Sequence, residues 1–147
     1  MEFNFVEINS DYYQQGLKIR EQLFFANFVN AQELLNDEYE QKSIHLVAKQ
    51  KERVLGTGRL TIIKNKAIIS QMTVLPKFQK QNVGKQLLSC LLEKAISLNS
   101  TTVELSARLT ALDFYKKSGF LPVGEVYASV KTGISHQNMI MNLVPKS

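Results

Sequence analysis

The chain has 147 residues and a formal net charge of +5, and its 44% hydrophobic and 21% charged residues are ordinary for one globular domain. No apolar run is long enough to span a bilayer, no signal peptide opens the chain, and the single cysteine excludes an internal disulfide. We therefore expect one cytoplasmic domain, residues 1–147, that makes no membrane contact. The lysines are scattered without an aromatic array, so nucleic-acid binding is not expected.

The N-terminal residues predict a strand and a helix. A short strand is expected at residues 3–8. Tyr13, Leu17 and Phe24 then recur at helical spacing, which predicts an amphipathic helix over residues 11–27.

An acidic segment and a β meander follow. Residues 31–41 contain four carboxylates, and this pattern predicts a second short helix or a loop with a solvated face. Two polar turns then separate three predicted strands, which lie at residues 44–49, 54–63 and 67–74.

Residues 74–84 join the third of these strands to an amphipathic helix with a leucine-rich stripe. Backbone N–H groups at a helix N-terminus lack partners, and the helix dipole adds positive charge, so such a junction can bind a pyrophosphate. Gly84 leaves room for an oxygen to reach these amides, and Asn82 tolerates a positive φ better than other non-glycine residues. The segment therefore predicts a phosphate-binding loop.

The C-terminal part predicts a strand, a short helix and a hairpin. After a strand at residues 102–106, Thr110 and Asp113 form the pattern of a capping box, and Gly119 supplies a helix stop. Two further strands are expected to close the sheet as a hairpin, at residues 120–127 and 136–143.

Two of these segments resemble motifs of a known family. Residues 74–84 read Val-x-Pro-x-x-Gln-x-x-Asn-x-Gly and are similar to the coenzyme A loop of the GNAT superfamily of N-acetyltransferases, with Gln79 and Gly84 in place and Asn82 where a glycine is usual. Downstream, Tyr115 stands four residues before Gly119-Phe, which resembles the superfamily's Tyr-x-x-x-Gly-Phe signature. Three later segments resemble the C-terminal half of the ElaA-like branch, namely residues 122–127, 133–134 and 136–139.

The resemblance implies an α/β GNAT fold, in which a mixed, mostly antiparallel and strongly bent sheet is flanked by helices. Such a fold binds acetyl-CoA in a V-shaped split between two neighbouring strands. The implied reaction is direct transfer of the acetyl group from acetyl-CoA to a primary amine in a ternary complex.

The family pattern also implies roles for residues beside the split. The backbone amide of Met72 faces the thioester carbonyl, and Tyr115 is the implied general acid, because a hydroxyl with an ordinary pKa of about 10 can donate a proton to a departing thiolate. The implied contacts of the cofactor are Met72, Thr73, Val74, Gln79, Lys80, Gln81, Asn82, Val83, Gly84, Lys85 and Tyr115.

The general base and the acceptor site are less defined. The strand before the loop ends without a carboxylate, so the amine loses its proton through water or through one of five side chains that no spacing distinguishes: Glu33, His45, Glu104, Glu125 and His136. Three residues match ElaA-like positions and are candidate substrate contacts, namely Arg20, Arg59 and His136. A guanidinium in a cleft favours a substrate carboxylate, and a structural role for each of the three is equally open.

One alternative function belongs to a different class. The absent carboxylate is compatible with a sensor or regulatory domain that binds acyl-CoA without turnover. The expected ligands are acetyl-CoA and an amine on a small molecule or peptide, with no metal. The sequence leaves both the acceptor and the choice between monomer and homodimer open.

Overall fold

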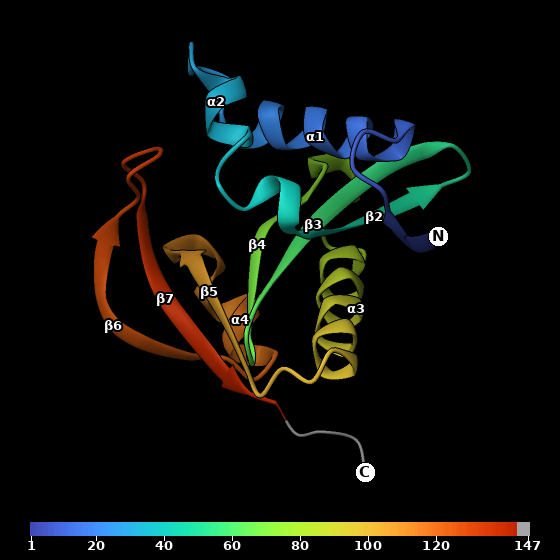
Figure 1. Cartoon of the computed structure of the whole chain (residues 1–147). Helices are drawn as coiled ribbons and strands as arrows, with labels where there is room; N and C mark the ends of the chain where they lie inside the picture. Colours follow the sequence, from blue (N-terminus) through green and yellow to red (C-terminus); the bar gives the residue numbers. More distant parts are fainter. Residues whose placement is uncertain (144–147) are drawn as a thin grey trace.

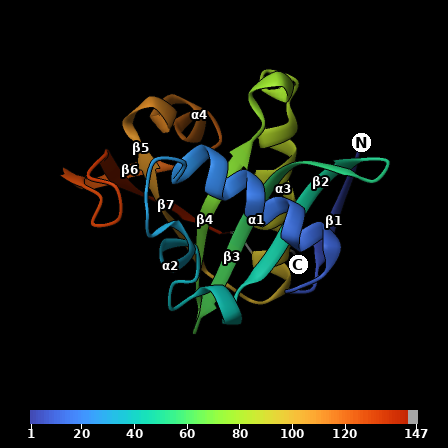
Figure 2. The same cartoon turned by 90° about the horizontal axis from the view of Figure 1, so that it is seen from above.

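The computed structural model describes residues 1–143 and contains a seven-stranded sheet between helices (Figures 1 and 2). Residues 144–147, the end of the predicted domain, lie outside the described residues. The elements follow one another as β1 (Glu2–Val6), α1 (Asp11–Phe24), α2 (Ala31–Leu35), η1 (Glu40–Lys42), β2 (Ile44–Gln50), β3 (Arg53–Ile63), β4 (Lys66–Val74), η2 (Pro76–Phe78), α3 (Val83–Ser97), β5 (Thr102–Arg108), η3 (Leu109–Ala111), α4 (Leu112–Lys117), β6 (Leu121–Ala128) and β7 (Ser135–Asn142).

The sheet is mixed. Its strand order is β1-β2-β3-β4-β5-β7-β6, and β4 and β5 form its one parallel pair among the described residues. A parallel pair requires a crossover connection, and α3 provides it between these two strands. The observed sheet agrees with the predicted mixed and mostly antiparallel arrangement.

Helices α1 and α3 cover opposite faces of the sheet (Figure 2). A Cβ atom added to Gly16 of α1 would lie 3.2 Å from the Thr57 hydroxyl, and one added to Gly58 would lie 2.9 Å from Leu91 of α3. Because successive residues of a strand point to opposite faces, the two helices pack on the two sides of β3. The absence of side chains at these glycines allows the close approach.

The main core lies between α3 and the sheet. The apolar stripe of α3 is buried as its helical spacing predicts, and it packs on inward-facing residues of the strands. Burial of this apolar surface is the principal stabilising contribution at this interface. The fully buried members include Leu46, Leu60, Leu87, Leu88, Leu91 and Ala95.

The two parallel strands separate near the middle of the sheet. β4 pairs with β5 only from Lys66 to Ile68, and beyond this point no strand of residues 1–143 pairs with β4 on that side. A β-bulge accompanies the separation, since Gln71 and Met72 together oppose Gly58 of β3 and Gln71 has a φ of 55°. Bulges bend a strand, so this one helps to turn the end of β4 away from β5.

Two local predictions need correction. The first helix ends at Phe24 rather than Asn27, because the chain turns there to bury Phe25. The predicted capping box does not form: Ala111 is the N-cap of α4, no side chain caps that helix, and Thr110 lies within the preceding 3-10 turn. The predicted hairpin is present as β6 and β7.

Candidate functional site

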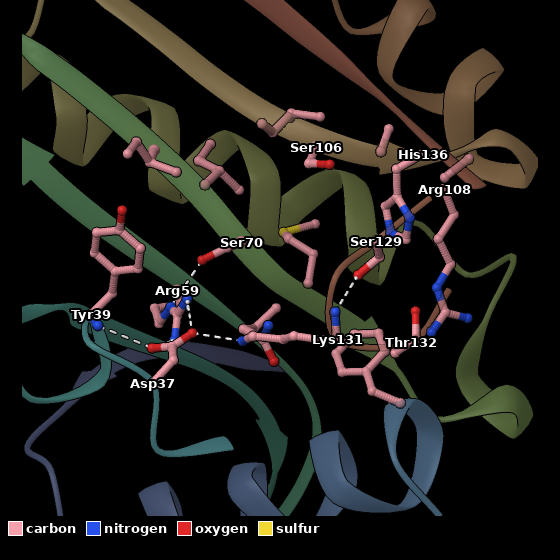
Figure 3. A pocket seen from close by; sticks show the side chains of 18 of the residues that line it. Asp37, Tyr39, Arg59, Ser70, Ser106, Arg108, Ser129, Lys131, Thr132 and His136 are labelled. Atoms are coloured by element: carbon pink, nitrogen blue, oxygen red, sulfur yellow. Dashed lines mark hydrogen bonds and ion pairs between the residues drawn. The ribbon is translucent and has the colours of Figure 1, made fainter. Parts of the chain in front are cut away.

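A cavity of about 420 Å³ occupies the split between β4 and β5 (Figure 3). Met72 lines it from β4, Ser106 and Arg108 from β5, and Tyr115 from α4. The end of α1 and the connection between β6 and β7 complete its walls. The cavity therefore lies where the sequence predicts the thioester, between the separating strands and beside Met72 and Tyr115.

The backbone at the end of β4 is open towards β5. Thr73 pairs with Thr57 and Val74 with Gly56 on the β3 side, and no strand of residues 1–143 pairs with them on the β5 side, although the Val74 carbonyl accepts from the Gln79 side chain. Unpaired backbone groups in a cleft are available to a ligand's amides. This arrangement suits the predicted contacts of Met72, Thr73 and Val74 with a pantetheine chain, which remain predictions.

The loop after β4 has the backbone conformation that its sequence predicts. Asn82 adopts the left-handed conformation with a φ of 65°, and Lys80 does the same. Asn82 is the N-cap of α3 but its side chain makes no capping hydrogen bond, so the first amides of the helix are not occupied by it. The Gln79 side chain is used inside the loop, where its amide donates to the Val74 carbonyl over 2.9 Å.

The remaining loop residues divide into two kinds. The side chains of Lys80, Gln81, Asn82 and Lys85 are exposed, whereas Val83 is buried in the core. Any contact of Val83 with a phosphate must therefore come from its backbone amide. A Cβ atom added to Gly84 would lie 3.7 Å from the Phe114 ring, an ordinary contact, so the fold itself does not require glycine at this position.

Tyr115 is held by the end of its helix. The amides of Gly119 and Phe120 donate to the carbonyls of Lys116 and Tyr115, which is the Schellman pattern, and Gly119 has the positive φ that this pattern requires. The Tyr115 ring packs edge-on against Phe114 and Phe120. The helix stop predicted at Gly119 is thus present, and it determines where the Tyr115 ring lies.

The Tyr115 hydroxyl is free to donate. It makes no hydrogen bond with residues 1–143. The one fully buried side-chain oxygen or nitrogen without a partner in that range is Ser100 Oγ. The Tyr115 oxygen is therefore not fully buried, and it is accessible from the cavity that Tyr115 lines. Burial raises the pKa of Tyr115 to about 12. The hydroxyl therefore keeps its proton throughout the neutral and moderately basic range.

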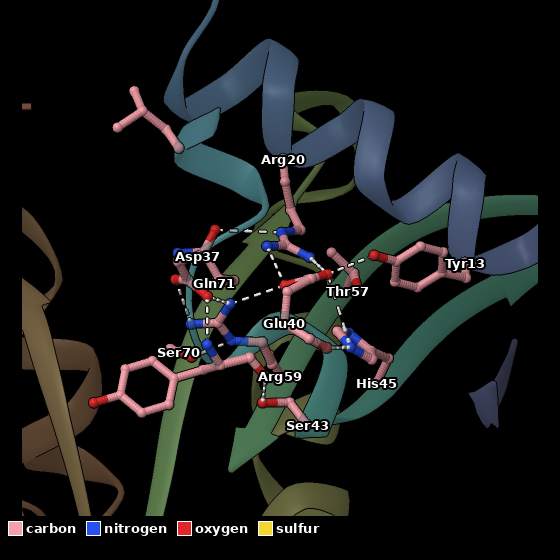
Figure 4. Close-up of polar contacts among 12 residues, drawn as sticks. Tyr13, Arg20, Asp37, Glu40, Ser43, His45, Thr57, Arg59, Ser70 and Gln71 are labelled. Atoms are coloured by element: carbon pink, nitrogen blue, oxygen red, sulfur yellow. Dashed lines mark hydrogen bonds and ion pairs between the residues drawn. The ribbon is translucent and has the colours of Figure 1, made fainter. Parts of the chain in front are cut away.

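Arg20 and Arg59 belong to a buried ion-pair network (Figure 4). Arg20 donates to both oxygens of Glu40, at 2.7 and 2.9 Å, and Arg59 donates to the same carboxylate over 2.8 Å. Tyr13 contributes a fourth hydrogen bond to Glu40. The Arg20 guanidinium is not part of the cavity wall, so the geometry favours the structural alternative for this residue.

The expectation of a solvated acidic face is wrong for two of its residues. Glu40 is 1% exposed and Asp37 is half-buried, because the chain after α2 turns both carboxylates towards Arg59. Burial opposes ionisation of Glu40, but hydrogen bonds from Arg20, Tyr13 and Arg59 and the Arg20 charge hold its pKa at about 2. The charge pattern of residues 31–41 is typical of an exposed face, but two of its four carboxylates are part of a buried ion-pair cluster.

Asp37 lies where this network reaches the cavity. Arg59 bonds both of its oxygens, at 3.0 and 3.1 Å, and Lys131 from the connection between β6 and β7 approaches to 2.7 Å. Burial by itself raises the pKa of Asp37, but the hydrogen bonds from Lys131 and Arg59 outweigh it and hold the pKa at about 2. A carboxylate this acidic is a poor base for an amine.

Two histidines were candidate bases, and their surroundings differ. His45 is buried beneath the network, its Nε2 contacts the Glu40 carbonyl, and burial lowers its pKa. His136 lines the cavity instead, and its Nδ1 lies 2.8 Å from the Ile134 carbonyl. Since a carbonyl only accepts, Nδ1 carries the proton, and Nε2 of the neutral ring then has the free lone pair.

The other three candidate bases, Glu33, Glu104 and Glu125, do not line this cavity. Sequence reasoning also missed several residues that line it, Asp37 and Arg108 among them. No motif marked them, and the strand predicted at residues 102–106 stops two residues short of Arg108, which ends β5 beside the split, the position where functional residues of α/β folds commonly gather.

Neither a membrane span nor a metal cluster is found in the part of the chain that the structure describes. No helix within residues 1–143 has the length and apolar character needed to cross a membrane. Within the same range, no three His, Cys, Asp or Glu residues are grouped so that they could hold a metal ion.

Comparisons with known proteins agree with this geometry. The profile of the acetyltransferase (GNAT) domain matches residues 8–143. An uncharacterized N-acetyltransferase of Bacillus subtilis, YjcF, is 27% identical over 133 residues, which cover 90% of this chain and 94% of the relative.

Solved structures share the fold. The crystal structure of Escherichia coli ElaA has a TM-score of 0.78 at 23% identity, covering 96% of this chain and 99% of ElaA. An aminoglycoside 6'-N-acetyltransferase complexed with coenzyme A has a TM-score of 0.81 at 14% identity, covering 100% and 99% of the two chains. These structural likenesses confirm the predicted fold, and the profile match across nearly the whole chain shows that it belongs to the GNAT family of acetyltransferases.

Proposed function

We propose that this acyltransferase moves the acetyl group of acetyl-CoA to a primary amine by direct attack in a ternary complex, within one domain of residues 1–147. The observation that carries the proposal is the cavity in the split, which is lined by Met72 where β4 separates from β5 and by Tyr115 of α4. The relative named as an N-acetyltransferase and the coenzyme A complex of the same fold support it.

The chain supplies groups for each part of this reaction. The first amides of α3 bind the pyrophosphate, the backbone of residues 72–74 binds the pantetheine, and the Met72 amide donates to the thioester oxygen as it becomes an oxyanion. The amine nitrogen forms a bond to the carbonyl carbon, and the carbon–sulfur bond then breaks. Tyr115 donates its proton to the departing thiolate, and no step requires a metal.

Exposure to acetyl-CoA and a panel of amines tests the proposal as a whole. Release of free CoA that depends on both the enzyme and one class of amine is the expected result. The opposite result is that acetyl-CoA binds but neither a small-molecule amine nor a peptide amine causes release of free CoA. That result would favour the alternative function, a sensor or regulatory domain that binds acyl-CoA without turnover. A metal chelator is expected to leave the rate unchanged.

Tyr115→Phe is expected to lower kcat by about 10²-fold while acetyl-CoA binding stays close to that of the wild type. The variant keeps the ring between Phe114 and Phe120 and removes only the proton donor, which is needed when the carbon–sulfur bond breaks. Because burial raises the pKa of this hydroxyl to about 12, the loss should be equal at pH 7 and pH 9. An unchanged kcat, with chemistry shown to be rate-limiting, would leave Tyr115 as a packing residue.

We also propose that His136 accepts the amine proton through Nε2, in place of the carboxylate that β4 lacks. His136→Asn keeps a donor for the Ile134 carbonyl and removes Nε2, so kcat/KM should fall by about 10²-fold at pH 7. The loss should shrink as pH rises and the amine becomes neutral in solution. Glu125→Gln, a change to an exposed candidate base outside the cavity, is the control. A pH profile parallel to that of the wild type would assign the proton transfer to water.

A further inference from the structure

Arg108 is a charged side chain of the cavity without a polar partner. It ends β5, lines the cavity, and its guanidinium lies over the Phe24 ring of α1, 5.1 Å from the ring centroid. A guanidinium has five N–H donors and keeps its charge at every accessible pH. None of these donors makes a hydrogen bond or ion pair with any of residues 1–143.

No other charged side chain of the cavity neutralises the positive charge of Arg108. Asp37 is the one carboxylate among the lining residues, and it is already bonded by Arg59 and Lys131. In Figure 3 Asp37 and Arg108 lie at opposite ends of the cavity. Arg59 is further balanced by Glu40, which it shares with Arg20. The cavity therefore has excess positive charge, and Arg108 is the lining cation that has no carboxylate partner among residues 1–143.

The Arg108 guanidinium lies on the α1 face of the sheet. Arg108 contacts Phe24 of α1, whereas the phosphate loop leads into α3 on the opposite face. The strand register also pairs Arg108 with His136 of β7. Opposed residues of antiparallel strands have Cβ atoms about 5 Å apart, so Arg108 and His136 enter the same end of the cavity side by side, as Figure 3 shows.

We infer that the amine acceptor carries an oxyanion, a carboxylate or a phosphate, and that Arg108 binds it. The planar fork of a guanidinium matches both groups with paired hydrogen bonds. We expect a short acceptor, with a few bonds between its amine and its oxyanion, because Arg108 and His136 are paired in the strand register. The inference rests on the proposed acetyl transfer and adds the chemical class of its second substrate.

Binding of matched amines tests this assignment without requiring turnover. Calorimetry in the presence of coenzyme A compares β-alanine with propylamine and O-phosphoethanolamine with ethanolamine. At least one amine that carries an oxyanion should bind about 10- to 100-fold more tightly than its counterpart without one, the range for hydrogen bonds between charged groups. The pair that shows the difference identifies the oxyanion as carboxylate or phosphate.

Variants then locate the preference. Arg108→Gln should remove it, Arg108→Lys should retain part of it, and acetyl-CoA binding should not change. Arg53→Gln is the matched control, because Arg53 also lies over a phenylalanine, Phe78, but is exposed and outside the cavity. No preference in the wild type, or a preference that survives in Arg108→Gln, would overturn the inference, as would weaker acetyl-CoA binding as the sole effect. Failure of CoA release, by contrast, would overturn only the proposed catalysis.

Discussion

Gly84→Glu is expected to abolish binding of coenzyme A, with a loss of affinity of at least about 10²-fold. Position 84 is in the first turn of α3, where a carboxylate interacts favourably with the helix dipole, so the variant should fold. The new carboxylate occupies the place of a phosphate oxygen and repels the rest of the pyrophosphate. Two like charges about 4 Å apart near a protein surface repel by about 4 kcal/mol, which accounts for the size of the effect.

Two variants control for space and for backbone conformation. Gly84→Ala adds a Cβ atom 3.7 Å from Phe114, so it should fold and weaken binding much less than glutamate does. Asn82→Gly should bind at least as well as the wild type, since glycine adopts the φ of 65° without strain. Calorimetry measures the coenzyme A affinity of all three variants. Wild-type affinity in Gly84→Glu would show that the pyrophosphate binds elsewhere.

Glu40→Gln is expected to lower the free energy of unfolding by about 3–5 kcal/mol, the usual cost of removing one partner from a buried ion pair. Glu40 accepts from Arg20, Arg59 and Tyr13, and its loss leaves the Arg20 guanidinium buried with only Gln71 as a further hydrogen-bond acceptor. Urea unfolding provides the measurement. Glu38→Gln changes an exposed carboxylate two residues away and should cost less than about 0.5 kcal/mol.

A double variant separates the ion pair from other effects of the substitution. Arg20→Gln combined with Glu40→Gln should lose less stability than the two single changes added together, because each single change strands the other charge. Simple additivity, or a loss below about 1 kcal/mol in Glu40→Gln, would mean that the network stabilises the fold no more than exposed salt bridges do.

The same network predicts how stability depends on pH. The pKa values of Glu40 and Asp37 are about 2 in the folded protein, below the ordinary carboxyl values, so the unfolded chain binds protons first as the pH falls. Their stabilisation is therefore complete above about pH 5 and is lost progressively as the pH falls towards 2. Unfolding midpoints at pH 6, 4 and 3 should fall less steeply in Glu40→Gln than in the wild type.

Local chemistry allowed most of the fold to be predicted. The leucine stripe of α3, the left-handed Asn82 and the helix stop at Gly119 each depend on a few neighbouring residues, and the structure contains all three. The predicted capping box was wrong because Thr110 lies within the 3-10 turn that joins β5 to α4, so it is not the N-cap of α4. Local propensity cannot weigh such a turn against the packing of the strand before it.

The sequence by itself determined the family, the backbone conformation of the loop before α3 and the helix end after Tyr115, since these are short motifs in which backbone conformation and residue type are coupled. Only the tertiary structure decided which charges meet. Arg20, Glu40 and Arg59 are about twenty residues apart in turn, and folding brings them into one buried cluster, which leaves Arg108 as the arginine available to a ligand. Contacts between residues so distant in sequence depend on strand order and register, and a charge pattern read along the chain contains neither.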